Sequence, residues 1–235
     1  MIKELEARIK EIIPRTYNVI SFRAEASAGA DFKAGQFMEV SLKTKPVLKR
    51  YLSISSSPTE KGYLEFTKKI TQSDFCKALQ NLKPGDFLNL RYPLGKFTLS
   101  GGEKKIAFLS GGIGITPIRS IVKFIVDTKL GLDMVLFYAN RSAKDIAFWE
   151  DFEDMQRSYA KLKVIHVISE FSQGLTGCKS GMINAEMIRE CLSDYAERKF
   201  YLCGPPVMVS AMQAILSKEL SLPYSQVITE NFQGY

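Results

Sequence analysis

Residues 105–117 read KIAFLSGGIGITP, an apolar run followed at once by a glycine-rich turn. The run suits a buried strand, and apolar positions recur at helical spacing from Ile118 to Thr128. Glycines between a strand and a helix let backbone N–H groups approach a pyrophosphate, and proline suits a helix start because it needs no N–H partner. The stretch predicts a phosphate-binding turn with five candidate cofactor-binding residues: Gly111, Gly112, Gly114, Thr116 and Pro117. A turn that binds nothing is the alternative, because Pro117 replaces the third glycine of the dinucleotide fingerprint.

Beyond this turn, strand and helix patterns alternate along the chain. The strand at 105–110 and the helix at 118–128 are followed by predicted strands at 134–139, 163–168, 199–203 and 226–230, and by helices at 147–157, 184–192 and 207–220. Such alternation favours a parallel sheet with helices on both faces.

A second turn, Cys203-Gly204-Pro205-Pro206, ends the strand at 199–203. Ligands of open parallel sheets gather at the carboxyl ends of the strands, so this turn and the glycine turn are expected to face one crevice. Cys203, Gly204 and Pro205 are therefore further candidates for cofactor binding. Taken alone, Cys203 is typical of a buried structural thiol.

Asn140 and Arg141 follow the strand at 134–139 and belong to the same crevice. Residues 138–142 contain no carboxylate that can bind the ribose 2′-hydroxyl of NADH. Arg141 can either meet a 2′-phosphate or pair with Asp145, so the choice between NADH and NADPH stays open.

Residues 1–100 show short alternating segments broken by turn residues, a pattern typical of an antiparallel barrel or sandwich. The predicted strands are 5–12, 19–24, 36–42, 50–53, 63–69 and 87–92. One helix is predicted at 73–81, capped by Ser73 and stopped by Lys83-Pro84-Gly85. Because residues 100–104 read as a linker, we predict two domains of different class, a β-barrel at 1–100 and an α/β domain at 104–235.

The residue inventory excludes several kinds of chemistry. The four cysteines show neither a CxxC pair nor the spacing of an iron–sulfur cluster, and the single histidine, His166, leaves a zinc site or a Ser/His/Asp triad without its parts. An organic cofactor is expected to supply the chemistry, with no metal site. Residues 1–20 lack the apolar core of a signal peptide, and no apolar run approaches the ~18 residues of a membrane helix. A cytoplasmic protein without membrane insertion is therefore expected.

The segment KRYLSISSSP at residues 49–58 places a guanidinium, an aromatic ring and several hydroxyls side by side. Arg50 can fork onto a phosphate, and Ser53 can hydrogen-bond a cofactor heteroatom. A basic edge strand followed by a serine-rich loop is the alternative interpretation.

Taken together and in this order, the motifs resemble those of the ferredoxin–NADP reductase family of flavoproteins over nearly the whole chain. The family's Arg-x-Tyr-Ser flavin motif is similar to residues 50–53, and its nicotinamide-nucleotide motifs resemble residues 111–117 and 203–206. Further similar segments are Ala34–Phe37, Pro84–Asp86, Pro93–Phe97 and Glu230–Phe232. The resemblance implies a flavin-binding antiparallel β-barrel domain followed by an NAD(P)-binding α/β domain with a parallel sheet, and no iron–sulfur domain.

The resemblance also implies a reaction: hydride passes from NAD(P)H to N5 of bound FAD, and electrons then pass to an acceptor. FMN, which some relatives use, is the alternative flavin. By family analogy Ser53 hydrogen-bonds flavin N5 and Arg50 pairs with the diphosphate. Thr67, Lys68 and Lys69 are implied to present backbone and charge along the diphosphate.

The resemblance implies that Cys203 lies near the nicotinamide. It also implies that Glu230 lies close enough to polarise the reacting groups or to donate a proton. With Ser53, these are the catalytic candidates. Tyr235 is implied to stack over the flavin and yield its place to nicotinamide, with a frayed terminus as the alternative.

Two positions depart from the family pattern. Leu52 stands where the family has its flavin-stacking Tyr, with Tyr51 beside it, and both are carried as cofactor-binding candidates. Ile70 replaces the usual Gly of a Gly-x-x-Ser element, which leaves Ser73 and neighbouring backbone to contact the diphosphate.

The net charge of +7 lies entirely in residues 1–100, which carry 17 basic and 10 acidic side chains against 15 of each in residues 101–235. Because complementary charge steers association, we expect part of this excess to dock an acidic electron carrier such as a ferredoxin or flavodoxin. The residues concerned are Lys33, Lys43, Lys45 and Lys49.

Three other functions stay open at this point. The chain can be a reductase subunit that stays docked on an oxygenase, hydrogenase or dehydrogenase. It can be an NAD(P)H:free-flavin reductase whose flavin is a substrate. A nucleic-acid-binding module is remote, because only residues 43–51 interleave basic and aromatic side chains, and no nucleic acid is expected as a partner.

Overall fold

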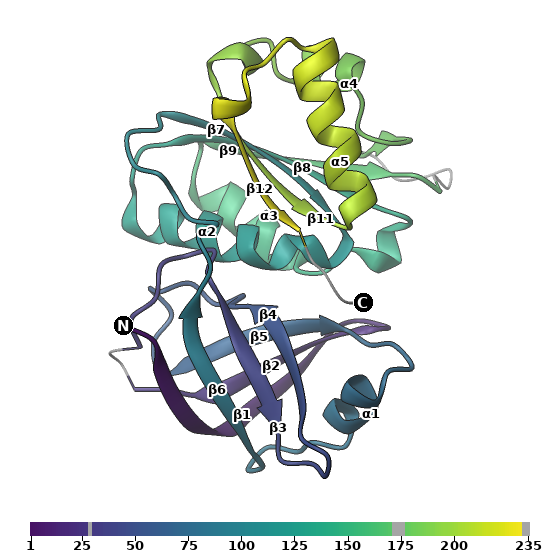
Figure 1. The fold of residues 1–235 in the computed structure, drawn as a ribbon. Coiled ribbons are helices and arrows are strands. Elements are labelled where there is room, and N and C mark those ends of the chain that lie inside the picture. Colours follow the sequence, from purple (N-terminus) through teal and green to yellow (C-terminus); the bar gives the residue numbers. More distant parts are fainter. Residues whose placement is uncertain (28–29, 171–176, 232–235) are drawn as a thin grey trace.

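The structure is a computed structural model that describes residues 1–27, 30–170 and 177–231. Figure 1 shows two stacked units, an all-β unit built from the first part of the chain and an α/β unit built from the rest. The two classes of fold predicted from the sequence are confirmed.

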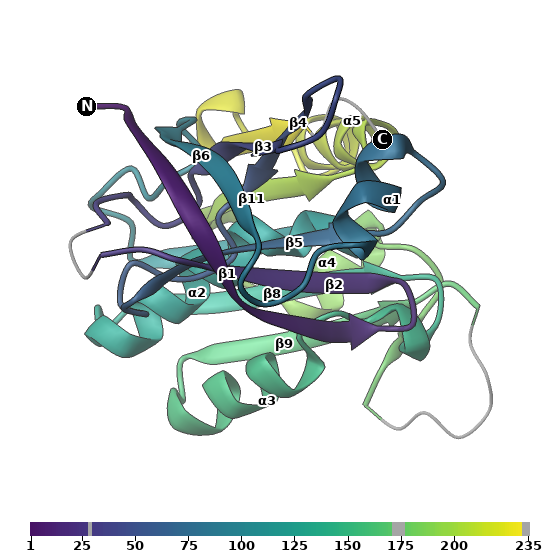
Figure 2. The same ribbon diagram turned by 90° about the horizontal axis from the view of Figure 1, so that it is seen from below.

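The first unit is a six-stranded antiparallel sheet in the order β4-β3-β6-β1-β2-β5. The strands are β1 (Lys3–Thr16), β2 (Val19–Glu25), β3 (Phe37–Leu42), β4 (Leu48–Ser53), β5 (Tyr63–Lys69) and β6 (Phe87–Leu94). The long β1 pairs with β6 through its first half and with β2 through its second half, which curls the sheet (Figure 2). A bridge between Ile54 and Phe66 brings the two ends of the sheet together as a barrel.

One helix, α1 (Asp74–Gln80), lies at the side of this barrel. As predicted, Ser73 is its N-cap, and the Ser73 hydroxyl accepts a hydrogen bond from the backbone N–H of Cys76 at 3.4 Å. Phe75 and Leu79 of α1 pack into the apolar core of the barrel.

The second unit has a six-stranded parallel sheet in the order β10-β9-β8-β7-β11-β12. Its strands are β7 (Lys105–Gly111), β8 (Asp133–Asn140), β9 (Leu162–Ile168), β10 (Lys179–Ser180), β11 (Lys199–Gly204) and β12 (Val227–Asn231). The chain moves outward from β7 to β9 and then restarts on the other side of β7 with β11. The order therefore reverses between β7 and β11, and ligands of such sheets bind outside the carboxyl ends of the strands at that point.

Helices cover both faces of this sheet. The α-helices are α2 (Ile115–Thr128), α3 (Trp149–Ser158), α4 (Ala185–Cys191) and α5 (Pro206–Ala214). In Figure 1, α2 and α3 lie on the face turned toward the barrel, and α4 and α5 lie on the opposite face. Val19, Ala34 and Phe97 of the first unit are buried in the same apolar cluster as α2 and α3, so the two units share a core.

Short helical turns complete the chain: η1 (Gly112–Gly114), η2 (Ala143–Asp145), η3 (Tyr195–Glu197), η4 (Ile215–Glu219, a π-helical turn) and η5 (Tyr224–Gln226). The helix predicted at 207–220 is thus α-helical only to Ala214, and the one predicted at 118–128 begins earlier, at Ile115. Among the described residues, no helix is long and apolar enough to cross a membrane.

Candidate active site

The glycine turn lies directly on the turn that follows β11. A Cβ atom on Gly114 would lie 2.7 Å from the carbonyl carbon of Cys203 and 2.5 Å from the Cα of Gly204. The Ser110 hydroxyl donates a hydrogen bond to the Cys203 carbonyl at 3.3 Å. The two motifs that the sequence placed in one crevice are therefore in backbone contact.

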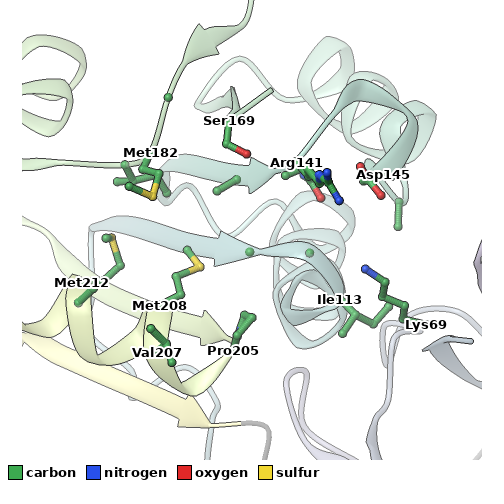
Figure 3. A pocket seen from close by; sticks show the side chains of 18 of the residues that line it. Lys69, Ile113, Arg141, Asp145, Ser169, Met182, Pro205, Val207, Met208 and Met212 are labelled. Atoms are coloured by element: carbon green, nitrogen blue, oxygen red, sulfur yellow. The ribbon is translucent and has the colours of Figure 1, made fainter. Parts of the chain in front are cut away.

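A pocket of about 830 Å³ opens over these two turns (Figure 3). The predicted cofactor residues Gly111, Gly112, Asn140, Arg141 and Pro205 all line it. The barrel closes one side of the pocket with Tyr17, Asn18, Val19 and Lys69. The pocket is thus built from both units of the chain.

The polar end of the pocket contains Lys69, Arg141 and Asp145 (Figure 3). Arg141 forms an ion pair with Glu170 at 2.6 Å, and not with Asp145 as the sequence alternative had it. Asp145 instead accepts hydrogen bonds from the Ser142 hydroxyl at 2.7 Å and the Tyr17 hydroxyl at 2.8 Å. Burial acts to raise the pKa of Asp145, but these hydrogen bonds outweigh burial, so the pKa is lowered.

Asn140 lines the same pocket and is only 7% exposed. Within the described part of the chain, neither its amide nitrogen nor its amide oxygen has a hydrogen-bond partner. Buried amides are normally paired, so this side chain is available to a polar ligand. The glycine turn and the orphaned amide together fit a nucleotide.

Cys203 and Glu230 lie side by side at the ends of β11 and β12, in register with each other. Burial, reinforced by the Glu230 carboxylate, raises the pKa of the Cys203 thiol well above its usual value. Burial also raises the pKa of Glu230. The cysteine is therefore a neutral thiol at neutral pH, beside a carboxyl group that holds a proton more readily than usual.

Thr116 and Pro117 are buried in the first turn of α2. The Thr116 hydroxyl donates a hydrogen bond to the Ile113 carbonyl at 3.1 Å, so it braces the glycine turn. Tyr235 and Phe232 lie outside the described residues.

A second cluster of predicted residues gathers in the barrel, next to α1. The Arg50 guanidinium lies 5.5 Å from the Phe75 ring. Burial, together with the nearby Arg50 charge, lowers the pKa of Lys68, although the Cys76 thiol opposes the shift. Two neighbouring cations and the Ser73 hydroxyl are a donor set that fits a diphosphate.

Arg50 and Tyr51 point to opposite faces of β4, because side chains alternate along a strand. Tyr51 is 56% exposed and packs edge-on against Phe37, at 5.9 Å between ring centroids. The ring therefore does not share the face of Arg50 and Leu52. Leu52 is left on the face where the family Tyr is expected.

The three residues at the end of β5 also separate. The Thr67 hydroxyl is engaged with the hydroxyls of Ser21 at 2.7 Å and Ser55 at 2.9 Å. Lys69 instead lines the pocket over the glycine turn. Of these three residues, Lys68 is the one whose charge lies beside Arg50. Ser53, at the end of β4, is buried.

The domain families agree with this geometry. The oxidoreductase FAD-binding domain matches residues 5–99, and the oxidoreductase NAD-binding domain matches residues 108–214. The chain belongs to the ferredoxin–NADP reductase-like flavoprotein oxidoreductases. Its first unit is an FAD-binding domain and its second an NAD-binding domain.

Proteins similar to this chain include an oxygenase reductase subunit and a cytochrome b5 reductase. The chain is 32% identical over 218 residues to a glycine betaine monooxygenase reductase subunit of Pseudomonas aeruginosa. This alignment covers 89% of the chain and 59% of the relative. The chain is 30% identical over 220 residues to NADH-cytochrome b5 reductase 1 of Neosartorya fischeri, covering 87% of this chain and 71% of the relative. The solved ferredoxin reductase in carbazole 1,9a-dioxygenase superposes with a TM-score of 0.84 at 26% identity, over 99% of this chain and 70% of that one. The reductase thus spans somewhat more than half the length of the first of these relatives.

The apolar end of the reductase's nucleotide pocket was not predicted. Met182, Met208 and Met212 line it, across from Arg141 (Figure 3). Met208 and Met212 are one helical turn apart on α5, a spacing that sequence reasoning assigns to a core. Met182 is 77% exposed, and nothing in its sequence neighbourhood signals a ligand. Flexible, polarisable methionines suit the flat faces of a purine ring.

Proposed function

We propose that this reductase takes electrons from NAD(P)H through its FAD and delivers them to a protein partner, as the reductase component of a multicomponent oxygenase or a related redox complex. An independent acidic carrier such as a ferredoxin or flavodoxin is the second candidate for the acceptor. Relatives named as monooxygenase reductase subunits favour the first candidate. The basic excess of the flavin domain favours any acidic partner.

One observation carries the proposal: the nucleotide pocket lies at the junction of the two domains. Its floor is the glycine turn, and one wall is the end of β5 and the turn after β1. β5 also carries Lys68, which lies beside Arg50 in the flavin domain. A nucleotide in this pocket and a flavin in the barrel would therefore be neighbours across a single strand.

When bound, the flavin accepts a hydride from the nicotinamide and releases electrons to an acceptor. The protein's task is to hold the two rings in reacting geometry and to exclude water. We assign Ser53 a hydrogen bond to flavin N5, and Arg50, Lys68 and Ser73 the flavin diphosphate. Gly111–Gly114 are assigned the nucleotide pyrophosphate.

On the nicotinamide side, we assign Cys203 and Glu230 to the ring's surroundings. The Cys203 thiol is fully buried in the apolar core below the turn and is neutral, so it places no negative charge beside the ring. Asn140 supplies a donor and an acceptor to the ribose or the adenine, and Met182 and Met208 border the space for the purine.

The acceptor surface proposed from charge is the β3–β4 hairpin with Lys43, Lys45, Val47 and Lys49, all exposed. Lys43 is paired with Glu6 at 3.0 Å and Lys49 with Glu39 at 3.7 Å, so part of the positive charge is offset within the protein. Exposed Val47 at the hairpin adds apolar surface to the charge, a combination that suits docking of a protein.

The proposal is tested with purified protein and anaerobic NADH or NADPH. The protein should be yellow after desalting, and reduced nicotinamide should bleach the flavin absorbance within seconds. Bound flavin that stays oxidised with both NADH and NADPH contradicts the hydride-transfer assignment. Colour lost completely on desalting, with activity restored by added free flavin, supports instead a reductase that uses flavin as a substrate.

A further inference from the structure

Arg119 in the second turn of α2 is only 4% exposed and links the nucleotide domain to the flavin domain. Its Nη1 donates to the backbone carbonyl of Ser55 at 3.1 Å and also to Glu60, while Nη2 donates to the other Glu60 oxygen at 3.1 Å. Its Nε and Nη2 donate to Asp151 of α3 at 3.0 and 2.7 Å. One side chain thus joins α2 and α3 to the segment that follows β4.

The next residue on the helix makes a second bond to the same segment. The fully buried Ser120 donates its hydroxyl proton to the Ser56 carbonyl at 2.6 Å. Ser55 and Ser56 come directly after Ser53 and Ile54. Consecutive residues of α2 therefore hold consecutive backbone carbonyls at the end of the flavin motif.

The other end of this connection is the nucleotide turn. α2 begins at Ile115, immediately after Gly112–Gly114, and Arg119 lies about 6 Å further along the helix axis. A helix is stiff over so short a length. The turn assigned to the nucleotide and the segment that carries Ser53 are therefore coupled through one helical turn.

The electrostatics of the contact favour a fixed geometry. Despite its burial, the hydrogen bonds and charges of Glu60 keep the pKa of Arg119 above its usual value, so it stays charged. Arg119 lowers the pKa of Glu60 in turn, although burial opposes that shift. A guanidinium fork on two carboxylates and a carbonyl fixes direction as well as distance.

We propose that Arg119 is a positioning residue for hydride transfer, setting the distance and angle between the nucleotide turn and the flavin motif. This proposal rests on the proposed function. Buried ion pairs contribute little net stability but restrict geometry, and a displacement of about 1 Å between reacting groups can cost about 100-fold in rate.

The test compares Arg119→Met and Arg119→Lys with Arg198→Met. Arg198 is a matched control because it is equally buried and paired, with Asp194 at 2.8 Å and Asp133 at 2.6 Å, all inside the nucleotide domain.

Arg119→Met should slow anaerobic flavin reduction by about 100-fold, with flavin content and NAD(P)H affinity changed by less than about 3-fold. Arg119→Lys should recover part of the rate, because lysine keeps the charge without the fork. Arg198→Met should leave the rate unchanged at a comparable loss in Tm. Equal slowing in Arg119→Met and Arg198→Met overturns the proposal.

Glu60→Gln provides a milder variant, since the amide oxygen still accepts a bond from Arg119, while the NH2 group faces donors that the second carboxylate oxygen had accepted. It should slow reduction by about 10-fold with a smaller loss in Tm than Arg119→Met, whereas an unchanged rate overturns the proposal. Amide hydrogen exchange of residues 54–57 gives a readout independent of turnover. Faster exchange there in Arg119→Met than in Arg198→Met supports the role of Arg119, and equal exchange contradicts it, even if NAD(P)H fails to reduce the wild-type flavin and the proposed function falls.

Discussion

Gly114 lies against the carbonyl group of Cys203, with room for no side chain between them: a Cβ on Gly114 would be 2.7 Å from the carbonyl carbon. Both sides of the contact are backbone, which cannot rotate away as a side chain can. The two turns can approach this closely only because Gly114 has no Cβ.

Gly114→Ala should push these turns apart. We expect it to lower the free energy of unfolding by about 1–3 kcal/mol, as overpacking does, and to weaken NAD(P)H binding by at least about 10-fold, measured by titration calorimetry. Gly112→Ala is the comparison, because a Cβ on Gly112 meets nothing within 4 Å. Its left-handed φ of +52° should cost about 1–2 kcal/mol. Unimpaired nucleotide binding by Gly114→Ala contradicts the prediction.

The strands and the two domain classes were predictable because their hydrophobic periods differ, about two residues in the barrel and a strand–helix alternation afterwards. The start of α2 was not, because the turn at Gly112–Gly114 continues directly into helix and leaves Pro117 within the first turn. The two-residue β10 is too short to give any period. In each of these cases tertiary packing, not local pattern, sets the boundary.

The pocket was predictable where backbone forms its surface and less so where side chains do. The glycine turn and the Cys203 turn are recognisable because only glycine permits their contact. Tyr51 was placed with the flavin candidates by its neighbourhood in sequence, yet strand alternation turns it to the other face of β4. Arg119 and Met182 carry no sequence signal, because their partners lie on segments distant in the chain.

Arg50→Ala should yield largely colourless protein. Arg50 and Lys68 are neighbours in the flavin domain, and removing one cation takes away the fork that suits a diphosphate. Lys49→Ala is the control, since Lys49 adjoins Arg50 but points to the opposite face of β4 and pairs with Glu39. Flavin content is read from absorbance after desalting. Stoichiometric flavin in the Arg50 variant would show that this cluster does not hold the cofactor.

His166 should make folding stability depend on pH above the range where carboxylates titrate. Its ring is 4% exposed, stacks on Trp149 at 4.3 Å, and has no hydrogen-bond partner on either nitrogen within the described residues. Burial lowers its pKa to about 4, against about 6.5 in the unfolded chain. Between these values the unfolded state binds more protons, so stability falls as the pH falls.

From pH 7.5 to pH 5 this loss should reach at most about 2 kcal/mol, measured by urea unfolding. His166→Phe should flatten the profile in that range. As the only histidine of the chain, His166 also gives a single imidazole signal for titration by NMR. A signal that titrates near pH 6.5 in the folded protein rules out the explanation.

Cys203 should resist alkylation in the folded protein. The thiol is fully buried and its pKa is raised by burial and by Glu230, whereas Cys191 is partly exposed. Since thiolates are the reactive form, iodoacetamide at pH 8 should modify Cys191 well before Cys203, as read by peptide mass mapping. In urea both should react alike. Equal rates in the folded state would place Cys203 in a more open environment than the structure gives it.

The charge asymmetry predicts how the reductase meets its acceptor. Replacing Lys43, Lys45 and Lys49 with Gln removes the cations of the β3–β4 hairpin and leaves Glu6 and Glu39 without these partners, so the surface becomes more negative. Reduction of an acidic ferredoxin should slow by about 10-fold at low salt, because charge complementarity acts mainly on the association rate.

The matching control is the triple change to Gln at Lys104, Lys163 and Lys218, three exposed lysines of the nucleotide domain. The same loss of three charges there should leave the rate within about 2-fold, if steering is local to the hairpin. The rate of reduction of a small neutral quinone should be equal in all variants, because this acceptor needs no docking surface. In the wild type, the ferredoxin rate should fall as salt rises, because salt screens exposed charges over about 10 Å at 0.1 M. Equal slowing by the two triple variants would mean that net charge, and not the hairpin, attracts the acceptor.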